Sequence, residues 1–352
     1  MTETPRWKRR PDGSTWGDWG PDDQLGRLNL LTPERVLTAR EEIRLGEVYC
    51  LSLPLDYPGR NILNPRRHPP VLEPTQGPDG APRYNYPLQL DDPRHIDVGC
   101  DDRVHMTLQY SSQWDAFCHM GQLFDADGDG VPEIRFYNGF KGGEDIIGPV
   151  DYNADGSQTP RPEAMGARKL GIETFAEKGV VGRGVLIDLE RFFGREGRHL
   201  VTYDELMRVL EETGATVEEG DLAFFYTGFA DLILEMEKEP DGPRLANSCA
   251  ALDGRDDKLL QWITDTGVAA LFADNYAVEQ SPARPMPGER YANSPLHQHC
   301  LFKLGVPLGE LWYLGDLARR LRELGRTRFF ATCQPLRLPG AVGSPANPVG
   351  IV

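Results

Sequence analysis

Two patterns of hydrophobic and polar positions divide the chain, and the second half has the more regular one. Between residues 202 and 332, a helical segment, a glycine and a short apolar run follow one another three times. Helices are predicted over 203–213, 257–266 and 316–324, and strands over 222–226, 268–273 and 327–332. Thr202 and Glu205 form a capping box at the first of these helices. The alternation predicts an α/β domain whose helices cover a sheet.

The first half has fewer regular segments. A helix is predicted to begin at Pro33, with Thr32 as its N-cap, and to end near Arg44, before a strand over 48–53. Prolines and glycines then recur too often for regular structure over residues 54–93. This segment is longer than an ordinary connection between elements. We therefore expect either a functional lid or an arm that reaches a neighbouring subunit.

A polar row follows this segment. The run 104–108 is rich in β-forming residues, and it predicts a strand that continues into the residues after it. Because strand side chains alternate between faces, one face is predicted to carry Gln109, Ser111, Gln113 and Asp115. His119 follows shortly after this row. Burying such a row is costly unless it binds something, although a solvent-exposed strand face explains the pattern equally well.

A histidine in the second half is a further candidate. Ser294 and Pro295 predict a helix start, which places His297 in the first turn. The positive end of the helix dipole disfavours a charged histidine there, so we expect a neutral ring that suits a ligand or a base. The alternative is a histidine on the surface. His299, two residues on, is predicted to face elsewhere and to be structural.

Other polar and aromatic residues would complete a pocket. Asp274 and Asn275 follow one apolar strand and Tyr226 ends another, at the strand ends where α/β proteins bind ligands. Ordinary turns explain these positions as well. Trp114 and Phe117 would give the pocket an aromatic wall, and they are equally good core residues.

An acidic run imitates the start of a calcium-binding loop. It reads Asp-Ala-Asp-Gly-Asp-Gly over residues 125–130. A full EF-hand loop needs a bidentate glutamate at its twelfth position, where this chain has Phe136. The run therefore favours a tight acidic turn, and calcium binding of another kind between Asp125 and Asp129 stays open.

Composition narrows the classes of partner. The chain has 38 Lys and Arg against 54 Asp and Glu, a net charge of −16 that repels nucleic acids and anionic lipids. We expect a small-molecule substrate and no nucleic acid or membrane partner. The six cysteines are scattered without a Cys-x-x-Cys pair, which is typical of reduced thiols in a cytoplasmic protein. The sequence shows neither an apolar run of membrane-spanning length nor a signal peptide.

The segment from Gln109 to His119 resembles the signature of the cyclase family, which includes kynurenine formamidase and isatin hydrolase. That signature reads His-x-Gly-Thr-His-x-Asp-x-Pro-x-His, and Asp115 and His119 match it by identity. Gln109 and Gln113 stand where the family has two histidine metal ligands. Other segments look like landmarks of the longer members, in the same order: 19–34, 137–139, 226–228, 295–297, 308–310 and 343–348. Together the matches span nearly the whole chain.

The resemblance implies a fold and an activity. The fold is the swivelling β/β/α fold, in which helices cover a mixed sheet. It would form a single domain over 1–352, with an extended N-terminal arm over about 1–30. The activity is hydrolysis of a C–N bond in a small aromatic or cyclic amide by metal-activated water. His119 would be the proton shuttle, and Asp115 a metal ligand or the group that orients the water. His297, with a one-residue offset, and Glu310 would complete the metal site, and a homodimer or homotetramer is expected.

The two glutamines change the expected metal. A glutamine binds a metal only through a neutral carbonyl oxygen, whereas imidazole is a much better donor to zinc. We therefore do not expect high-affinity zinc binding, whereas the remaining oxygen ligands still suit manganese or magnesium. In a metal-free alternative, Asp115 and His119 act as a carboxylate–imidazole pair, and Gln109 and Gln113 hold the substrate. A further alternative is a protein without hydrolase activity that binds a small molecule, isomerises it or acts on lactones.

Overall fold

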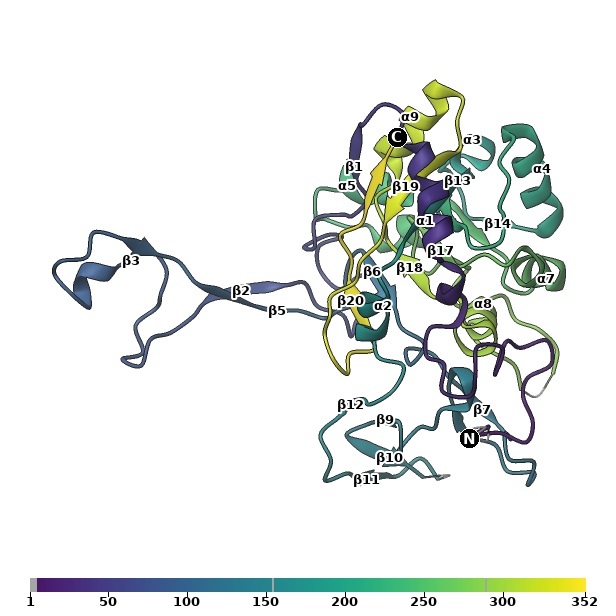
Figure 1. The fold of residues 1–352 in the computed structure, drawn as a ribbon, viewed down its shortest axis with the longest axis horizontal. Helices are drawn as coiled ribbons and strands as arrows, with labels where there is room; N and C mark the ends of the chain where they lie inside the picture. Colours follow the sequence, from purple (N-terminus) through teal and green to yellow (C-terminus); the bar gives the residue numbers. More distant parts are fainter. Residues whose placement is uncertain (1–4, 154, 289) are drawn as a thin grey trace.

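The computed structural model describes residues 5–153, 155–288 and 290–352, and it is built around one large mixed sheet (Figure 1). Nine strands follow one another across this sheet. In spatial order they are β1 (Val48–Cys50), β21 (Val349–Ile351), β19 (Arg328–Thr332), β13 (Val181–Asp188), β15 (Leu222–Tyr226), β17 (Ala270–Ala273), β18 (Leu308–Glu310), β6 (Gln113–Asp115) and β20 (Gly343–Pro345). β13, β15, β17 and β18 are parallel, and the pairs outside them are antiparallel. The predicted α/β class with a mixed sheet is confirmed.

Helices accompany the sheet. They are α1 (Pro33–Ala39), α2 (Glu173–Lys178), α3 (Glu190–Phe193), α4 (Tyr203–Thr213), α5 (Phe229–Glu235), α6 (Gly242–Ala246), α7 (Asp257–Thr266), α8 (Pro295–His297) and α9 (Gly315–Leu324). Short 3-10 helices are η1 (Gly26–Leu30), η2 (Arg40–Glu42), η3 (Leu88–Leu90) and η4 (Tyr137–Gly139), and the π-helix η5 (Gln298–Leu304) continues α8. No helix in the described part of the chain is long and apolar enough to cross a membrane.

The predicted helix–glycine–strand units are confirmed. α4 begins with the capping box of Thr202 and Glu205, and it ends at Gly214, whose φ of 67° is left-handed. α7 and α9 end in the same way, at Gly267 and Gly325. Glycine adopts this conformation without the steric penalty that a Cβ would bring, so the three chain reversals were readable from sequence.

The strand predicted through the polar row is wrong. β5 (Asp102–His105) ends before it, and turns separate it from β6, which begins at Gln113. Ser112 explains part of the break, because its hydroxyl accepts a hydrogen bond from the Leu53 amide and donates to the Leu311 carbonyl. These bonds satisfy backbone groups that a strand ladder would otherwise pair. β5 belongs instead to an arm, residues 69–107, that is separate from the main sheet.

This arm projects away from the rest of the molecule (Figure 1). β2 (Val71–Pro74) pairs with β5, and β3 (Tyr86–Pro87) pairs with β4 (Val98–Gly99). The expectation of irregular structure throughout residues 54–93 is therefore wrong in part. Prolines close β2 and β3 because these strands have free edges, where a missing N–H costs little.

The other small sheets lie outside the nine-stranded one. They pair β7 (Gln122–Phe124) with β8 (Glu133–Arg135), β9 (Ile146–Ile147) with β12 (Gly166–Ala167), β10 (Val150–Tyr152) with β11 (Gln158–Pro160), and β14 (His199–Val201) with β16 (Ala250–Leu252). The first four residues of the expected N-terminal arm lie outside the described residues. Within the rest of it, Trp16 and Leu28 are fully buried, and the Trp16 indole donates to the Phe302 carbonyl.

Aromatic side chains fill the core against the part of the sheet that β17, β18 and β6 form. Trp114 projects from β6 and packs edge-on against Phe272, Trp312 and Phe175. Phe117 contacts Phe175 and Tyr137 in the same core. Both Trp114 and Phe117 are 0% exposed, so they occupy the core positions that were their alternative interpretation.

Candidate functional site

Neighbouring strands bring three polar side chains together at one edge region of the sheet. β6 and β18 are antiparallel, and their register places Gln113 directly opposite Glu310. Asp115 lies two residues further along β6, so its side chain points to the same side as Gln113. Trp114, between them, points into the core. The predicted alternation is therefore correct within β6, although β6 is much shorter than expected.

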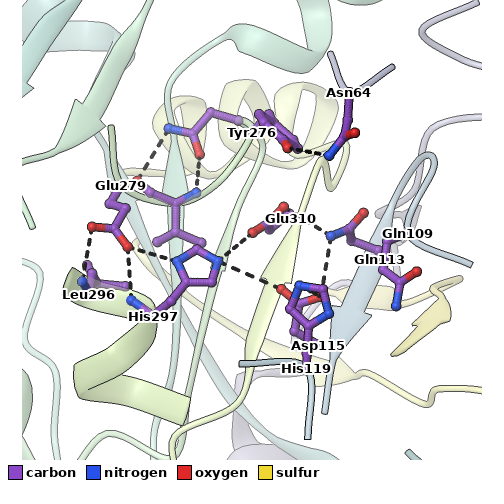
Figure 2. Close-up of polar contacts among 12 residues, drawn as sticks. Asn64, Gln109, Gln113, Asp115, His119, Tyr276, Glu279, Leu296, His297 and Glu310 are labelled. Atoms are coloured by element: carbon purple, nitrogen blue, oxygen red, sulfur yellow. Dashed lines mark hydrogen bonds and ion pairs between the residues drawn. The ribbon is translucent and has the colours of Figure 1, made fainter. Parts of the chain in front are cut away.

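His297 joins these residues from α8 (Figure 2). Its Nε2 lies 3.0 Å from Glu310 Oε1 and 4.0 Å from Asp115 Oδ2. Gln113 Nε2 donates to Glu310 Oε2 at 3.0 Å and to Asp115 Oδ1 at 3.4 Å. All four side chains are buried, with no more than 5% exposed. The structure thus brings together the three metal candidates predicted from sequence: Asp115, His297 and Glu310.

Glu279 supports the histidine from its other side. Its Oε1 lies 2.8 Å from His297 Nδ1, and its carboxylate also accepts from the backbone amides of Leu296 and His297. These bonds fix the orientation of the imidazole ring, as a carboxylate commonly does for a ligating histidine. Sequence reasoning missed Glu279, because a single glutamate after an apolar strand has no distinguishing pattern.

Arg67 covers the cluster from the root of the arm. Its Nη1 donates to the Gln109 carbonyl at 2.8 Å and to Gln113 Oε1 at 3.2 Å. A guanidinium group has only donors, so the Gln113 oxygen faces Arg67 and its NH2 group faces the carboxylates. Gln109 is mostly buried beside it and lies in the turn that leads into β6. Arg67 was also missed, because its run of prolines and arginines reads as an ordinary loop.

Burial and close charges set the protonation of the cluster. Burial raises the pKa of Asp115, and the nearby charge of Glu310 raises it further. Burial acts to lower the pKa of His297, but hydrogen bonds with Glu279 and Glu310 outweigh it and hold the pKa well above its ordinary value. Burial also acts to raise the pKa of Glu310, yet its bond with His297 lowers it overall.

The expectation of a neutral His297 is therefore wrong for this arrangement. Two carboxylate oxygens, at 2.8 Å and 3.0 Å from its ring nitrogens, favour the imidazolium. That stabilisation exceeds the modest preference of a first helical turn for a neutral group. A metal ligand must be deprotonated, so a cation bound here would displace the proton from Nε2.

The donor set fits a divalent cation. One ligand atom from each of Asp115, His297 and Glu310 lies within 4.8 Å of the others. Asp115 Oδ2 is buried and has no hydrogen-bond partner among the described residues, which is costly unless something else contacts it. Two carboxylates and one imidazole form an oxygen-rich set. Gln113 presents donors here and is not placed to ligate.

His119 lies between the cluster and solvent. Its Nε2 is 3.7 Å from Asp115 Oδ1, and its side chain is 19% exposed. It is therefore the partly accessible member of an otherwise buried group. His299, expected to face elsewhere, bonds to the Thr264 hydroxyl at 2.9 Å, and burial lowers its pKa to about 4.

The remaining pocket candidates make bonds that hold the fold. Asp274 accepts hydrogen bonds from the Thr227 and Gly228 amides and from the Thr227 hydroxyl. Asn275 bonds to the backbone of Ala250 and Val278. Tyr226 donates its hydroxyl proton to Asp231 at 3.0 Å. The hydrogen bonds of these three candidates thus support turns at the strand ends.

The three aspartates of the acidic run lie close together, in the tight acidic turn that the sequence favoured. Oxygens of Asp125, Asp127 and Asp129 lie within 4.8 Å of one another. Arg9 lies 3.1 Å from Asp125, and Arg135 lies 4.0 Å from Asp127, so guanidinium groups already balance part of the charge. Calcium binding at this turn stays a prediction.

Comparison with known proteins places this architecture. The profile of the family described as putative cyclase matches residues 51–280, more than half of the chain. This chain belongs to the putative cyclase family. A crystal structure described as a novel cyclase is 30% identical, with a TM-score of 0.71 over 96% of this chain and 97% of that one. The comparison with curated proteins gave no match.

Isatin hydrolases share the cyclase fold at lower identity. Isatin hydrolase A from Ralstonia solanacearum is 16% identical, with a TM-score of 0.53 over 91% of this chain and 97% of that one. An isatin hydrolase bound to the product analogue thioisatinate is 12% identical, with a TM-score of 0.51 over 92% and 99%. These likenesses establish that the cyclase fold is shared, and the chemistry must be argued from the residues of this chain.

Proposed function

We propose that this member of the putative cyclase family hydrolyses a C–N bond in a small aromatic or cyclic amide. The observation that carries the proposal is the convergence of Asp115, His297 and Glu310 around Asp115 Oδ2, which accepts no hydrogen bond from the described residues. The shared fold with isatin hydrolases, whose name states their substrate, supports a cyclic amide as the first substrate to test. The choice of an amide as the substrate class belongs to this proposal, and the test below examines it.

Asp115, His297 and Glu310 would hold a divalent cation. Such a cation, when bound, supplies a Lewis acid that makes water nucleophilic near neutral pH. Glu279 holds His297 Nδ1 and leaves Nε2 directed at the centre. The oxygen-rich set supports manganese or magnesium over high-affinity zinc.

His119 would move the proton. It accepts a proton from the attacking water, whose oxygen forms a bond to the carbonyl carbon. It then delivers that proton to the amide nitrogen as the C–N bond breaks, which yields a carboxylic acid and an amine. Its place beside Asp115 and its partial exposure support this role.

A second candidate is favoured by one observation. Arg67 turns the Gln113 NH2 group toward Asp115 and Glu310, so amide protons already lie between the two carboxylates. This arrangement supports a metal-free site that binds a small molecule, isomerises it or opens lactones, with Asp115 and His119 as the acid–base pair.

The test compares metal-stripped protein with protein supplied with Mn²⁺, Mg²⁺ or Zn²⁺. Isatin, formyl-kynurenine and a panel of lactones are offered to each, and products are measured chromatographically. The proposal expects amide turnover that depends on Mn²⁺ or Mg²⁺ and is lost in Asp115→Asn. Folded protein that turns over no amide with any metal would reject it, and turnover of lactones alone without metal would favour the second candidate.

A further inference from the structure

Arg67 is a partly buried cation that donates its hydrogen bonds to uncharged oxygens. Its Nη1 bonds to the Gln109 backbone carbonyl at 2.8 Å and to Gln113 Oε1 at 3.2 Å. Within residues 5–153, 155–288 and 290–352, no aspartate or glutamate forms an ion pair with it. Arg67 thus keeps a positive charge that no carboxylate of these residues contacts directly.

One edge of the guanidinium carries donors that these bonds do not use. Nε and Nη2 lie side by side on the planar group, and neither donates a hydrogen bond to another described residue. Two parallel N–H groups match the two oxygens of a carboxylate, and such a bidentate pair is stronger than a bond between neutral groups. The Nε–Nη2 edge therefore suits a planar anion.

Orienting Gln113 does not account for this edge. That role needs only Nη1, and a lysine or a neutral amide would donate an equivalent bond. Arginine differs from both in its planar, permanently charged fork, which matches carboxylates and phosphates. The residue type at position 67 thus indicates a function beyond the contact with Gln113.

A small hollow of about 10 Å³ adjoins Arg67, which is space for about one water-sized group. Its lining also includes Arg60, Asn64 and Tyr276, and no described residue of the lining is acidic. Arg60 pairs with Glu239, so Arg67 is the cation of the hollow that has no acidic partner in the described chain. One oxygen of a carboxylate fits this space, and the partly exposed side of Arg67 is open to the rest of the acid.

Tyr276 gives the hollow an aromatic side. The guanidinium carbon of Arg67 lies 5.6 Å from the centre of its ring. The Tyr276 hydroxyl accepts a hydrogen bond from Asn64 Nδ2 at 3.3 Å, so its own proton is available to a second oxygen (Figure 2). An aromatic acid at Arg67 would thus meet a ring and a further donor beside the guanidinium.

Gln113 sets the separation between Arg67 and the buried carboxylates. Its Oε1 lies 3.2 Å from Arg67 Nη1, and its Nε2 lies 3.0 Å from Glu310 Oε2. One side-chain amide and its two hydrogen bonds therefore separate the guanidinium from the centre of the cluster. A benzene ring with a carbonyl group on one side and a carboxylate on the other has a similar length, so such a molecule reaches both ends at once.

We propose that Arg67 selects substrates that carry a carboxylate, which it receives on its Nε–Nη2 edge while the scissile amide lies at the carboxylates beyond Gln113. The substrate class is an aromatic amide with a carboxylate in the meta or para position. Hydrolysis of 4-formamidobenzoate, for example, adds water across the C–N bond and gives formate and 4-aminobenzoate. This reaction rests on the proposed amide hydrolysis, whereas recognition of the acid depends on Arg67 and is measured without turnover.

The deciding test is calorimetric binding to the metal-free full chain at pH 7. The probe is 4-acetylbenzoate, which has the carbonyl and the carboxylate but no C–N bond to hydrolyse. Its neutral counterpart is 4-nitroacetophenone, because a nitro group has the shape of a carboxylate without the charge. The unchanged protein should bind the acid about tenfold or more tightly than the nitro compound.

Variants assign this preference to the guanidinium. Arg67→Met should abolish it, and Arg67→Lys should keep only part of it, because lysine retains the charge without the planar fork. Arg66→Gln is the matched control, since it removes an exposed positive charge from the adjacent residue while the Arg66 backbone amide still donates to Asn64 Oδ1. It should leave the preference intact, and melting curves check that each variant is folded.

Equal affinity of the unchanged protein for the two probes would overturn the proposal. A preference that survives Arg67→Met, or that Arg66→Gln removes as well, would also overturn it. With Mn²⁺ present, Arg67→Met should raise KM for 4-formamidobenzoate by about tenfold relative to KM for formanilide. Protein that binds the acid through Arg67 but hydrolyses neither amide would reject the proposed function and keep this inference. Hydrolysis of both amides without any preference for the acid in binding would do the reverse.

Discussion

Arg67 and Gln113 are joined by a hydrogen bond of 3.2 Å that decides which end of the Gln113 amide faces the buried carboxylates. Because Arg67 can only donate, the glutamine presents its NH2 group to Asp115 and Glu310. The residue that stands at a metal-ligand position of the family signature therefore acts here as a donor to two acids.

Removing the guanidinium should raise the affinity of the cluster for Mn²⁺. Arg67→Ala frees the Gln113 carbonyl to turn inward and removes a positive charge, and we expect about a tenfold gain in titration calorimetry. Arg66→Ala is the control, because Arg66 is exposed on the same loop, and its backbone amide and guanidinium donate to the Asn64 side-chain oxygen. Combining Arg67→Ala with Gln113→Leu should remove the part of the gain that comes from the glutamine, and an unchanged gain would contradict its role.

Restoring imidazole donors should restore tight zinc binding. Gln113→His places a nitrogen donor beside Asp115 and Glu310, and the pair Gln109→His and Gln113→His should raise zinc affinity by orders of magnitude. Competition with a chromogenic chelator measures the change, and Gln261→His on the surface of α7 is the control. Unchanged protein that purifies with stoichiometric zinc resistant to a mild chelator would contradict the expectation of weak zinc binding.

Asp115→Asn should stabilise the metal-free protein and at the same time abolish metal binding. The substitution removes a buried carboxylate whose Oδ2 lacks a hydrogen-bond partner among the described residues, so the metal-free protein should gain about 1–3 kcal/mol in free energy of unfolding. The same change should abolish the rise in melting temperature that Mn²⁺ gives the unchanged protein. Melting curves with and without Mn²⁺ measure both effects. Loss of stability in the metal-free variant would show that the carboxylate is satisfied in another way.

His119→Ala should slow catalysis without weakening substrate binding. If His119 moves the proton, kcat should fall by about a hundredfold or more, with KM nearly unchanged. His299→Ala is the control, since His299 is buried against Thr264, and its removal should lower the melting temperature while kcat per folded molecule stays the same. Equal kcat values for His119→Ala and unchanged protein would remove His119 from the mechanism.

Asp274 should make stability depend on pH in a defined window. Burial raises its pKa from 3.8 to about 7, although bonds from Thr227 and Gly228 favour the carboxylate. Between these two values the folded protein keeps a proton that the unfolded chain has lost. The contribution of Asp274 to the free energy of unfolding therefore falls as pH rises from about 4 to about 7, and is constant above that.

Urea unfolding across this range, compared with Asp274→Asn, isolates the effect. The variant loses the titration, and any altered hydrogen bond to Gly228 changes its stability equally at every pH. The stability of the unchanged protein relative to the variant should fall toward pH 7. Parallel curves for the two proteins would show that Asp274 keeps an ordinary pKa.

Local signals in the sequence determined the regular elements of the second half. The capping box at Thr202 and the left-handed glycines at 214, 267 and 325 act within one helical turn, so they can be read without knowing the fold. The family signature predicted that Asp115 belongs to the site. Later segments that resemble the family predicted that Glu310 and His297 lie beside it. The alternation of side chains within β6 was also readable, because it depends only on local backbone geometry.

Tertiary structure alone decided the contacts that control those residues. Glu279 is 18 residues from His297, and Arg67 is 46 residues from Gln113, and neither spacing has a local signature. The raised pKa of His297 follows from two carboxylates close to its buried ring, and their effect outweighs the helix position that the sequence showed. The arm's strands likewise pair across a long segment whose prolines and glycines read as irregular, because register between distant strands is fixed by their partners and not by either strand alone.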